Sequence, residues 1–160
     1  MKELYGNKVF VDSNAFIYFF LKQCNNLTIE IFRQAEKGNI ALITTTRVVD
    51  EVCYKSMIIS AKKKFNIDSK PLEKLKKDRD KIKMLAEDIK KVLDYIYTIS
   101  RVIEITNYDL KSLPDIMKTY GVFGNDALII SVMQSSGIKY LLSADRDFDN
   151  VGFIERLSAL

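Results

Sequence analysis

Short, mostly apolar runs alternate along the chain with longer stretches in which apolar residues recur every three or four positions. The runs lie at residues 8–11, 40–44, 101–105 and 138–142, with a weaker one at residues 152–155. Such runs are typical of buried parallel strands, and the three- and four-residue steps between them are typical of helices. Strands that alternate with helices predict an α/β fold, a three-layer α/β/α sandwich around a mostly parallel central sheet.

The middle of the chain carries the longest helical pattern. Apolar residues recur at helical spacing from residue 72 to residue 96, with one interruption around Asp78, and Pro71 stands at the start, where a helix tolerates proline. This pattern predicts a long amphipathic helix that forms a hairpin with the helix before it. We therefore expect a single domain, residues 1–160, with a lysine-rich helical insertion at about residues 61–99.

The overall composition is that of a globular domain. Apolar residues make up 48% of the 160 residues, which is enough for a sizeable core. The longest uninterrupted apolar run, Ala15 to Leu21, is too short to cross a bilayer, and the first residues do not form a basic and then apolar leader. We therefore expect a cytoplasmic protein without membrane contact.

The net charge of +4 is unevenly distributed. Residues 60–91 contain 12 of the 25 Lys and Arg residues and 6 of the 21 Asp and Glu residues, so this segment carries about +6. The remainder, with 13 basic against 15 acidic residues, carries about −2. A local basic excess favours a patch that binds polyanions, although a solvated helix face explains it equally well.

The chain contains no histidine and only two cysteines, Cys24 and Cys53. The lack of histidine excludes Ser-His and Cys-His nucleophiles and the usual zinc ligand. Two distant cysteines form neither a close-spaced metal pair nor a disulfide framework, so we expect reduced, packed thiols. Hydrolytic chemistry in this protein must therefore depend on carboxylates, lysine or a metal ion.

Acidic residues stand where the predicted strands end and helices begin. Asp12 follows the first strand, Glu51 lies early in the helix after the second, Asp126 opens a late helix, and Asp145 follows the fourth strand. Each acid alone has an ordinary explanation as a helix cap, a surface residue or a turn former. Because the carboxyl ends of parallel strands meet at one edge of a sheet, we expect all four to face one crevice.

Several carboxylates in one crevice repel one another, and a divalent cation removes that conflict. Mg²⁺ and Mn²⁺ prefer oxygen ligands and leave coordination positions open for a substrate phosphate. Such an ion lowers the pKa of a water molecule and stabilises charge on a phosphodiester in the transition state. The acids therefore predict a Mg²⁺ or Mn²⁺ site that needs no histidine base.

Four motifs carry a family resemblance. They are VFVDSNAFIYFF around Asp12, TTTRVVDEV around Glu51, GNDALIIS around Asp126, and LLSADRDF around Asp145 and Asp147. In this order and setting the motifs resemble the PIN domain family, including its toxin-type, VapC-like ribonucleases of bacterial and archaeal toxin–antitoxin pairs. The resemblance covers nearly the whole chain apart from the long helical segment in the middle.

The resemblance implies a Mg²⁺- or Mn²⁺-dependent endonuclease that cleaves RNA, often single-stranded. It implies these catalytic metal ligands, directly or through water: Asp12, Glu51, Asp126 and Asp145. Asp147 would be an auxiliary metal ligand, and Ser13, Asn14 and Ser143 would orient carboxylates or waters. The implied partners are an RNA substrate, an antitoxin or other protein, and a second copy of the chain in a homodimer.

Several alternatives stay open at the level of residues. Asp50 competes with Glu51, and only one of them can face the crevice because a helix turns by about 100° per residue. Asp147 is equally well explained as a turn residue, and Asp149 is better explained as one. The lysine-rich segment is an RNA clamp, a platform for a partner or a longer helical arm.

Two other functions compete with the nuclease. A catalytically weak PIN-fold module would bind RNA or a protein through the lysine-rich helices, but clustered carboxylates bring no advantage to a pure scaffold. A receiver-like phosphoacceptor also places acids at strand ends. It would need a lysine at the end of a late strand, whereas Lys139 stands at a strand start.

Overall fold

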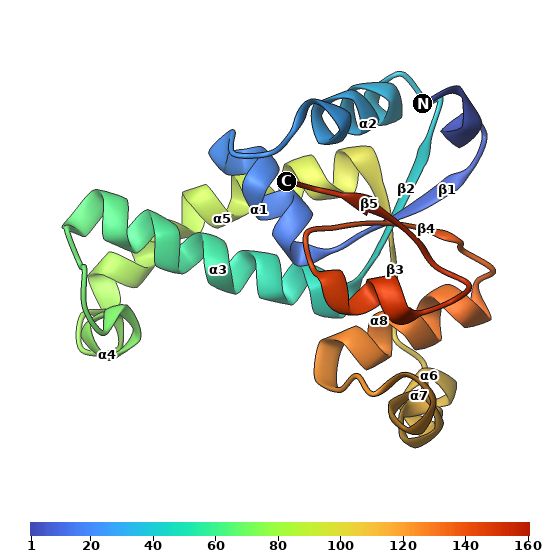
Figure 1. The fold of residues 1–160 in the computed structure, drawn as a ribbon. Helices are drawn as coiled ribbons and strands as arrows, with labels where there is room; N and C mark the ends of the chain where they lie inside the picture. Colours follow the sequence, from blue (N-terminus) through green and yellow to red (C-terminus); the bar gives the residue numbers. More distant parts are fainter.

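The computed structural model describes all 160 residues and contains one five-stranded sheet in which every neighbouring pair of strands is parallel. The order of the strands across the sheet is β3-β2-β1-β4-β5 (Figure 1). Their bounds are β1 Lys8–Val11, β2 Ala41–Thr45, β3 Ser100–Ile103, β4 Tyr140–Ser143 and β5 Glu155–Ser158. The prediction of a mostly parallel sheet is confirmed.

Helices cover both faces of the sheet. Figure 1 shows α2 above the strands and α6, α7 and α8 below them, which confirms the three-layer sandwich. The α-helices are α1 Ser13–Leu21, α2 Asn26–Glu36, α3 Thr46–Phe65, α4 Pro71–Lys76, α5 Arg79–Ile99, α6 Asn107–Lys111, α7 Leu113–Tyr120 and α8 Gly124–Ser135. Two short 3-10 helices, η1 Lys2–Leu4 and η2 Arg146–Asn150, complete the elements. None of the helices is both long enough and apolar enough to span a membrane.

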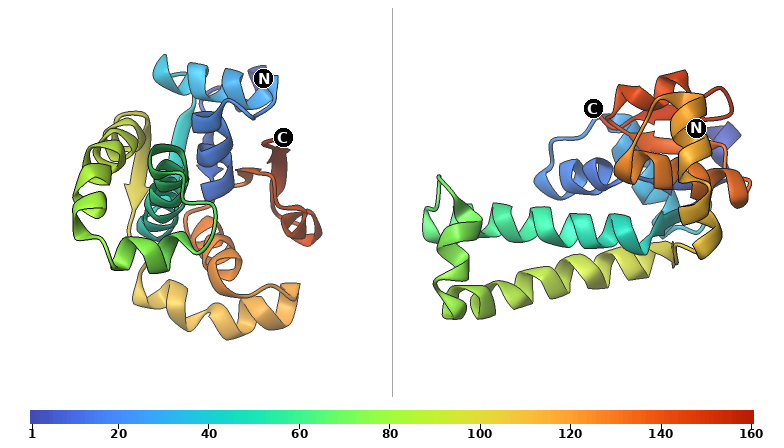
Figure 2. Two further views of the ribbon diagram at one scale, coloured as in Figure 1. Left: turned by 90° about the vertical axis from the view of Figure 1, so that its left-hand side faces the viewer. Right: turned by 90° about the horizontal axis from the view of Figure 1, so that it is seen from below.

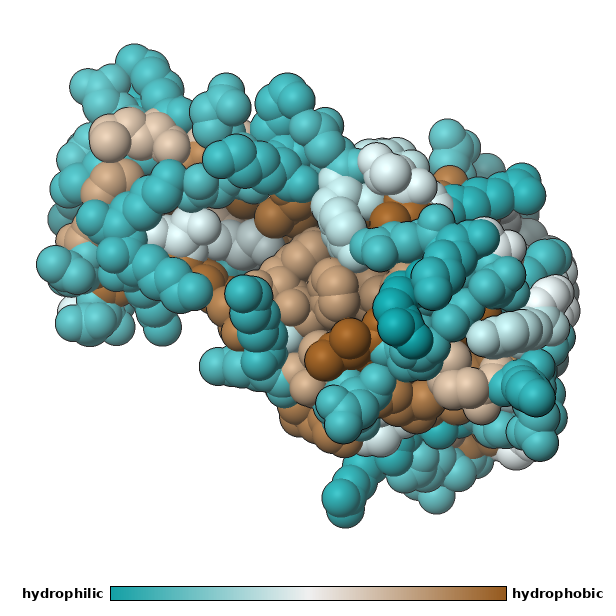
Figure 3. Space-filling model, turned by 90° about the horizontal axis from the view of Figure 1, so that it is seen from above, coloured by the Kyte–Doolittle hydropathy of each residue, from teal (hydrophilic) through white to brown (hydrophobic).

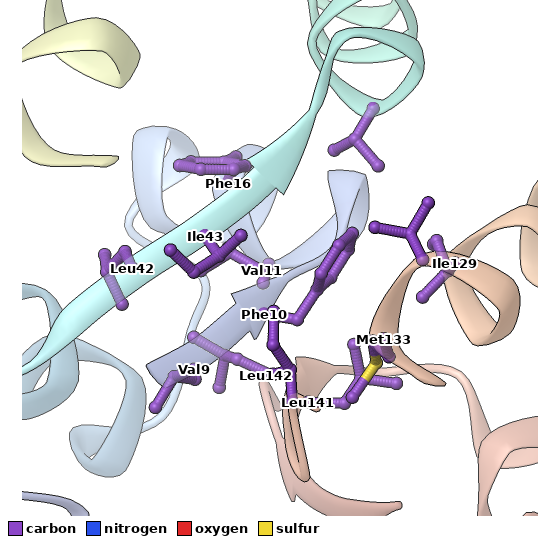
Figure 4. Close-up of a cluster of buried hydrophobic side chains, with 14 of the residues drawn as sticks. Val9, Phe10, Val11, Phe16, Leu42, Ile43, Ile129, Met133, Leu141 and Leu142 are labelled. Carbon is purple, nitrogen blue, oxygen red and sulfur yellow. The ribbon is translucent and has the colours of Figure 1, made fainter. Parts of the chain in front are cut away.

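The central strand β1 is buried on both faces. Val9, Phe10 and Val11 are fully buried, as expected for a strand covered by helices on two sides. In Figure 4, Ile129 and Met133 of α8 lie beside the side chains of the central strands. Burial of apolar side chains is the main favourable contribution to folding. The core around β1 therefore holds the ends of the central strands in place.

The register of the sheet brings distant residues together. Val11 at the end of β1 pairs with Leu142 of β4, and the backbone N–H of Asp12 donates to the carbonyl of Leu142 at 3.1 Å. Thr44 of β2 lies on the other side, and its hydroxyl donates to the carbonyl of Val11 at 3.0 Å. The residues that follow β1, β2 and β4 therefore lie at one edge of the sheet.

The helices α3 and α5 project from the body side by side, and α4 closes the far end of this helical arm (Figures 1 and 2). The arm has a small core of its own, formed by Ala61, Ile67, Leu75 and Leu85. Its outer surface is largely hydrophilic, whereas hydrophobic residues reach the surface where the arm meets the body (Figure 3). The predicted long helical arm is thus present.

Two predicted elements are wrong in detail. The helix expected over residues 72–96 is broken, because α4 ends at Lys76 and Asp78 caps a new helix by accepting a hydrogen bond from the N–H of Lys81 at 3.2 Å. The last strand is not at residues 152–155: that segment begins with a turn in which the N–H of Ile154 donates to the carbonyl of Val151 at 2.8 Å.

Candidate active site and metal centre

Asp12 is the most buried acid at the edge of the sheet, with 5% of the residue exposed. It is the N-cap of α1, and its Oδ1 accepts a hydrogen bond from the N–H of Ser13 at 2.6 Å. Its Oδ2 accepts from Asn14 Nδ2 at 2.7 Å and from Ser143 Oγ at 2.8 Å. Burial raises the pKa of Asp12 above its ordinary value, although the hydrogen bonds from Ser143 and Ser13 oppose the rise.

Asn14 and Ser143 join the end of β1 to the end of β4. Asn14 Oδ1 accepts a hydrogen bond from the N–H of Ala144 at 2.9 Å, and Ser143 Oγ accepts one from the N–H of Asp145 at 3.0 Å. Ser143 is completely buried. These bonds fix the carboxylate of Asp12 relative to the loop that carries Asp145.

A Ser143→Ala variant is expected to lose about 1–3 kcal/mol of unfolding free energy, because the buried Asp12 Oδ2 loses a donor and the N–H of Asp145 loses its acceptor. Urea unfolding in the presence of EDTA measures the loss. Ser69→Ala is a matched control: Ser69 is exposed, and its removal should change the free energy by less than about 0.5 kcal/mol. Equal stability of both variants would contradict the structural role of Ser143.

Glu51 approaches the same edge from α3. Asn125 Nδ2 donates to Glu51 Oε2 at 2.8 Å, and Lys55 Nζ lies 2.5 Å from Glu51 Oε1. The neighbouring Asp50 is exposed instead and pairs with Arg47 at 2.7 Å. The structure therefore places Glu51, and not Asp50, beside the site.

Three carboxylates form the tightest group. Asp126 lies in the first turn of α8, Asp145 is the N-cap of η2, and Asp147 follows within η2. Each of the three offers a carboxylate oxygen, and these oxygens lie within 4.8 Å of one another. Asp12 and Glu51 stand outside this group, but their charges act on it.

The electrostatics of the group show uncompensated negative charge. Burial and, to a smaller extent, repulsion from four other acids together raise the pKa of Asp126 to about 6; the repulsion decreases in the order Asp145, Asp12, Asp147 and Glu51. An oxygen-only set of carboxylates fits a hard divalent cation such as Mg²⁺ or Mn²⁺. Asn125 Oδ1, which is buried without a donor in the protein, adds an amide oxygen beside the site.

Two other acids have structural partners only. Asp149 forms a two-point contact with Arg156, at 2.5 Å to Nε and 3.0 Å to Nη2, as expected for a residue of the turn. Asp109 is buried in the capping box of α6, and burial acts to raise its pKa, but hydrogen bonds from Thr106 and two serines hold the pKa below its ordinary value. Neither acid belongs to the carboxylate group.

The sequence motifs pointed to the acids but missed two of their partners. Lys55 lies four residues after Glu51, so helical spacing alone places both on one side of α3. Asn125 stands directly before Asp126 in the motif GNDALIIS. Both residues carry a signal in the sequence, but their contacts with Glu51 depend on how α3 and α8 meet in space.

Comparison with known proteins agrees with the fold. Ribonuclease VapC2 of Methanocaldococcus jannaschii is 28% identical over 150 residues, which cover 93% of this chain and 92% of that protein. The structure of VapBC2 from Rickettsia felis bound to a DNA fragment from their promoter has a TM-score of 0.63 at 13% identity, with 96% of this chain and 99% of that chain covered. A toxin–antitoxin complex from Klebsiella pneumoniae gives a TM-score of 0.56 at 14% identity, covering 92% and 95%. The sequence profile of the PIN domain matches residues 9–154, and the chain therefore belongs to the PIN domain family.

Proposed function

We propose that this protein is a metal-dependent endoribonuclease that hydrolyses phosphodiester bonds of single-stranded RNA. One observation carries the proposal: five acids from four segments of the chain meet at the carboxyl edge of the sheet, where burial and repulsion from the other four acids raise the pKa of Asp126 to about 6. A fold does not gather several carboxylates at one edge without a cost in free energy, and a bound cation lowers that cost. The name of the M. jannaschii relative, a ribonuclease, supports the same activity.

The cation would be Mg²⁺ or Mn²⁺, held by Asp126, Asp145 and Asp147. Asp12 and Glu51 would complete the set directly or through water, so that Asp12, Glu51, Asp126 and Asp145 are the catalytic acids. When bound, the ion acidifies a water molecule and stabilises negative charge on the phosphodiester. In the reaction a water oxygen bonds to phosphorus, one ester P–O bond breaks, and the leaving oxygen takes up a proton.

The remaining polar residues of the site hold the acids in position. Ser13, Asn14 and Ser143 donate to Asp12, so its carboxylate has one orientation. Asn125 and Lys55 hold the two oxygens of Glu51. Such support of ligand side chains is worth about 10- to 100-fold in metal affinity or activity.

We also infer a protein partner that restrains the activity. Structures with the same fold include a toxin–antitoxin complex from K. pneumoniae, and this likeness supports an antitoxin for the present chain. The homodimer implied by the family resemblance remains a prediction.

The proposal is tested with an RNA oligonucleotide that carries a fluorophore at one end and a quencher at the other. The protein should cleave it with Mg²⁺ or Mn²⁺ and stop when EDTA is added, because the site then loses its cation. Gel analysis of the products should find internal cuts, as an endonuclease makes. Cleavage that continues in EDTA, or no cleavage with either ion, would contradict the proposal.

A further inference from the structure

A groove of about 550 Å³ lies between α1, α3 and α4, beside the acidic site. Its lining is mainly apolar and includes Ile17 of α1, Ile58 of α3 and Leu72 of α4. Tyr54 also lines the groove and is 48% exposed. Because α4 lies at the far end of the helical arm, the groove runs along α3 from α1 in the body to the end of the arm.

Lys55 connects the groove to the acidic site. Its Nζ lies 2.5 Å from Glu51 Oε1 and donates to Ser13 Oγ at 3.2 Å, while its side chain also lines the groove. The lysine is still 43% exposed, so its ammonium can reach a ligand. An extended ligand that ran from the acidic site in this direction would contact the ammonium of Lys55 first and the groove next.

The ionisable residues of the groove are mostly basic. Three lysines, Lys55, Lys70 and Lys76, line it together with one acid, Glu73. Glu73 lies 3.4 Å from Lys70, and both side chains are largely exposed, so this contact is weak. The groove thus carries positive charge directly beside a site that carries several negative charges.

We propose that the groove is the binding path of the RNA on one side of the scissile phosphate, which rests on the nuclease function proposed above. Lys55 binds the phosphate nearest to the carboxylates, and Lys70 and Lys76 bind phosphates further along. Tyr54 offers an aromatic face on which a base can stack, as aromatic side chains do in single-strand binding proteins. The arm therefore acts as an extension of the substrate site.

Charge and continuity favour RNA over a protein segment in this groove. A polyanion that lies across five acids needs cations immediately beyond them, and Lys55 supplies the first one at the junction. Single-stranded nucleic acid binds to surfaces of this composition, in which lysines contact phosphates and an aromatic or apolar surface contacts bases. An acidic, apolar peptide would match the same charges, and the experiment separates the two ligands.

The experiment compares a Lys70→Gln/Lys76→Gln variant with a matched control, Lys62→Gln/Lys91→Gln. The control removes the same charge from the same arm, at two exposed lysines that do not line the groove. In an Asp126→Asn background, binding of a 12-nucleotide RNA is measured against salt concentration. Loss of two phosphate contacts should make the log–log slope shallower by about 1.4, at roughly 0.7 per contact, and the control should change it much less.

Cleavage by the same variants in the wild-type background gives a second readout. The ratio of kcat/KM for the 12-nucleotide RNA to that for a trinucleotide should fall several-fold in the groove variant and stay constant in the control, because only the longer RNA reaches Lys70 and Lys76. Equal slopes and ratios for both variants would overturn the proposal. So would unchanged RNA binding by a groove variant that no longer binds an acidic amphipathic peptide, since the groove would then serve a protein.

This design separates the groove from the nuclease function. If the wild-type protein cleaved neither RNA with either ion, the proposed function would fail, while the salt dependence of binding would still test the groove. If it cleaved both RNAs and the two variants behaved alike, only the groove would fail.

Discussion

Replacing Asp126 with asparagine is expected to lower the rate of RNA cleavage by about 10³-fold or more. Asp126 belongs to the tightest carboxylate group, and burial, together with repulsion that a cation would relieve, raises its pKa to about 6. A change of about 4 kcal/mol in transition-state stabilisation corresponds to a factor of 10³, which is the scale of losing one strong electrostatic contact in an active site. Initial rates with the fluorescent RNA at saturating Mn²⁺ measure the effect.

The same variant should unfold at a higher temperature than the wild-type protein when no divalent ion is present. Asparagine has nearly the shape of aspartate and removes one of the mutually repelling charges. Higher stability together with lost activity would exclude misfolding as the cause. Asp50→Asn is the control, because Asp50 is exposed on the same helix as Glu51 and should leave the rate unchanged. Equal rates for wild type and Asp126→Asn would show that the site has been assigned to the wrong residues.

Without divalent metal, the thermal midpoint is expected to fall as the pH rises from about 4 to about 7. The pKa of Asp126 is about 6 in the folded protein against 3.8 for an unperturbed aspartate. Between these values the folded state holds a proton on Asp126 that the unfolded chain has released, so the contribution of this carboxyl to stability is greatest below pH 3.8 and declines through pH 6. Other acids titrate in the lower part of this range, so the wild type is compared with Asp126→Asn, in which the decline between pH 5 and pH 7 should be smaller.

Mg²⁺ or Mn²⁺ should reverse this decline. Metal binding requires deprotonated carboxylates, so the gain on adding metal should be larger at pH 7 than at pH 5. At an ion concentration of 100 times the dissociation constant the gain is about 2.7 kcal/mol. For a protein of this size that is roughly 5–10 °C in the midpoint. A gain of the same size at both pH values, or one that Asp126→Asn retains in full, would contradict a cation held by this group.

Much of the fold could be predicted because it depends on local patterns. The run at residues 8–11 is wholly buried from Val9 to Val11, as a parallel central strand requires. The interruption around Asp78 is visible in the sequence, but one helix was predicted through it because the apolar spacing resumes in α5, and only the cap at Asp78 marks the start of a new helix. The last strand was misplaced because residues 152–155 have no clear alternation of apolar and polar positions.

The sequence predicts where the acids of the candidate site lie, but not which of their side chains contact one another. The carboxyl ends of parallel strands lie at one edge of the sheet. The acids that follow β1 and β4, and those on α3 and α8, are therefore expected at that edge. The sequence did not reveal that Asp147 joins Asp126 and Asp145 within 4.8 Å, or that Asp12 lies outside that group in a network of hydrogen bonds. These differences depend on the path of the η2 loop and on side-chain orientation.

The amino-acid sequence by itself determined the fold class, the helical arm and the acids at the carboxyl edge of the sheet. Each of these follows from hydrophobic periodicity or from the geometry of a parallel sheet, which are properties of short segments. Only the tertiary structure decided which acid of the pair Asp50 and Glu51 faces the site, which lysine accompanies it, and that the arm forms a groove beside it. These features depend on how helices far apart in the chain pack together, and packing depends on the shapes of all the side chains between them.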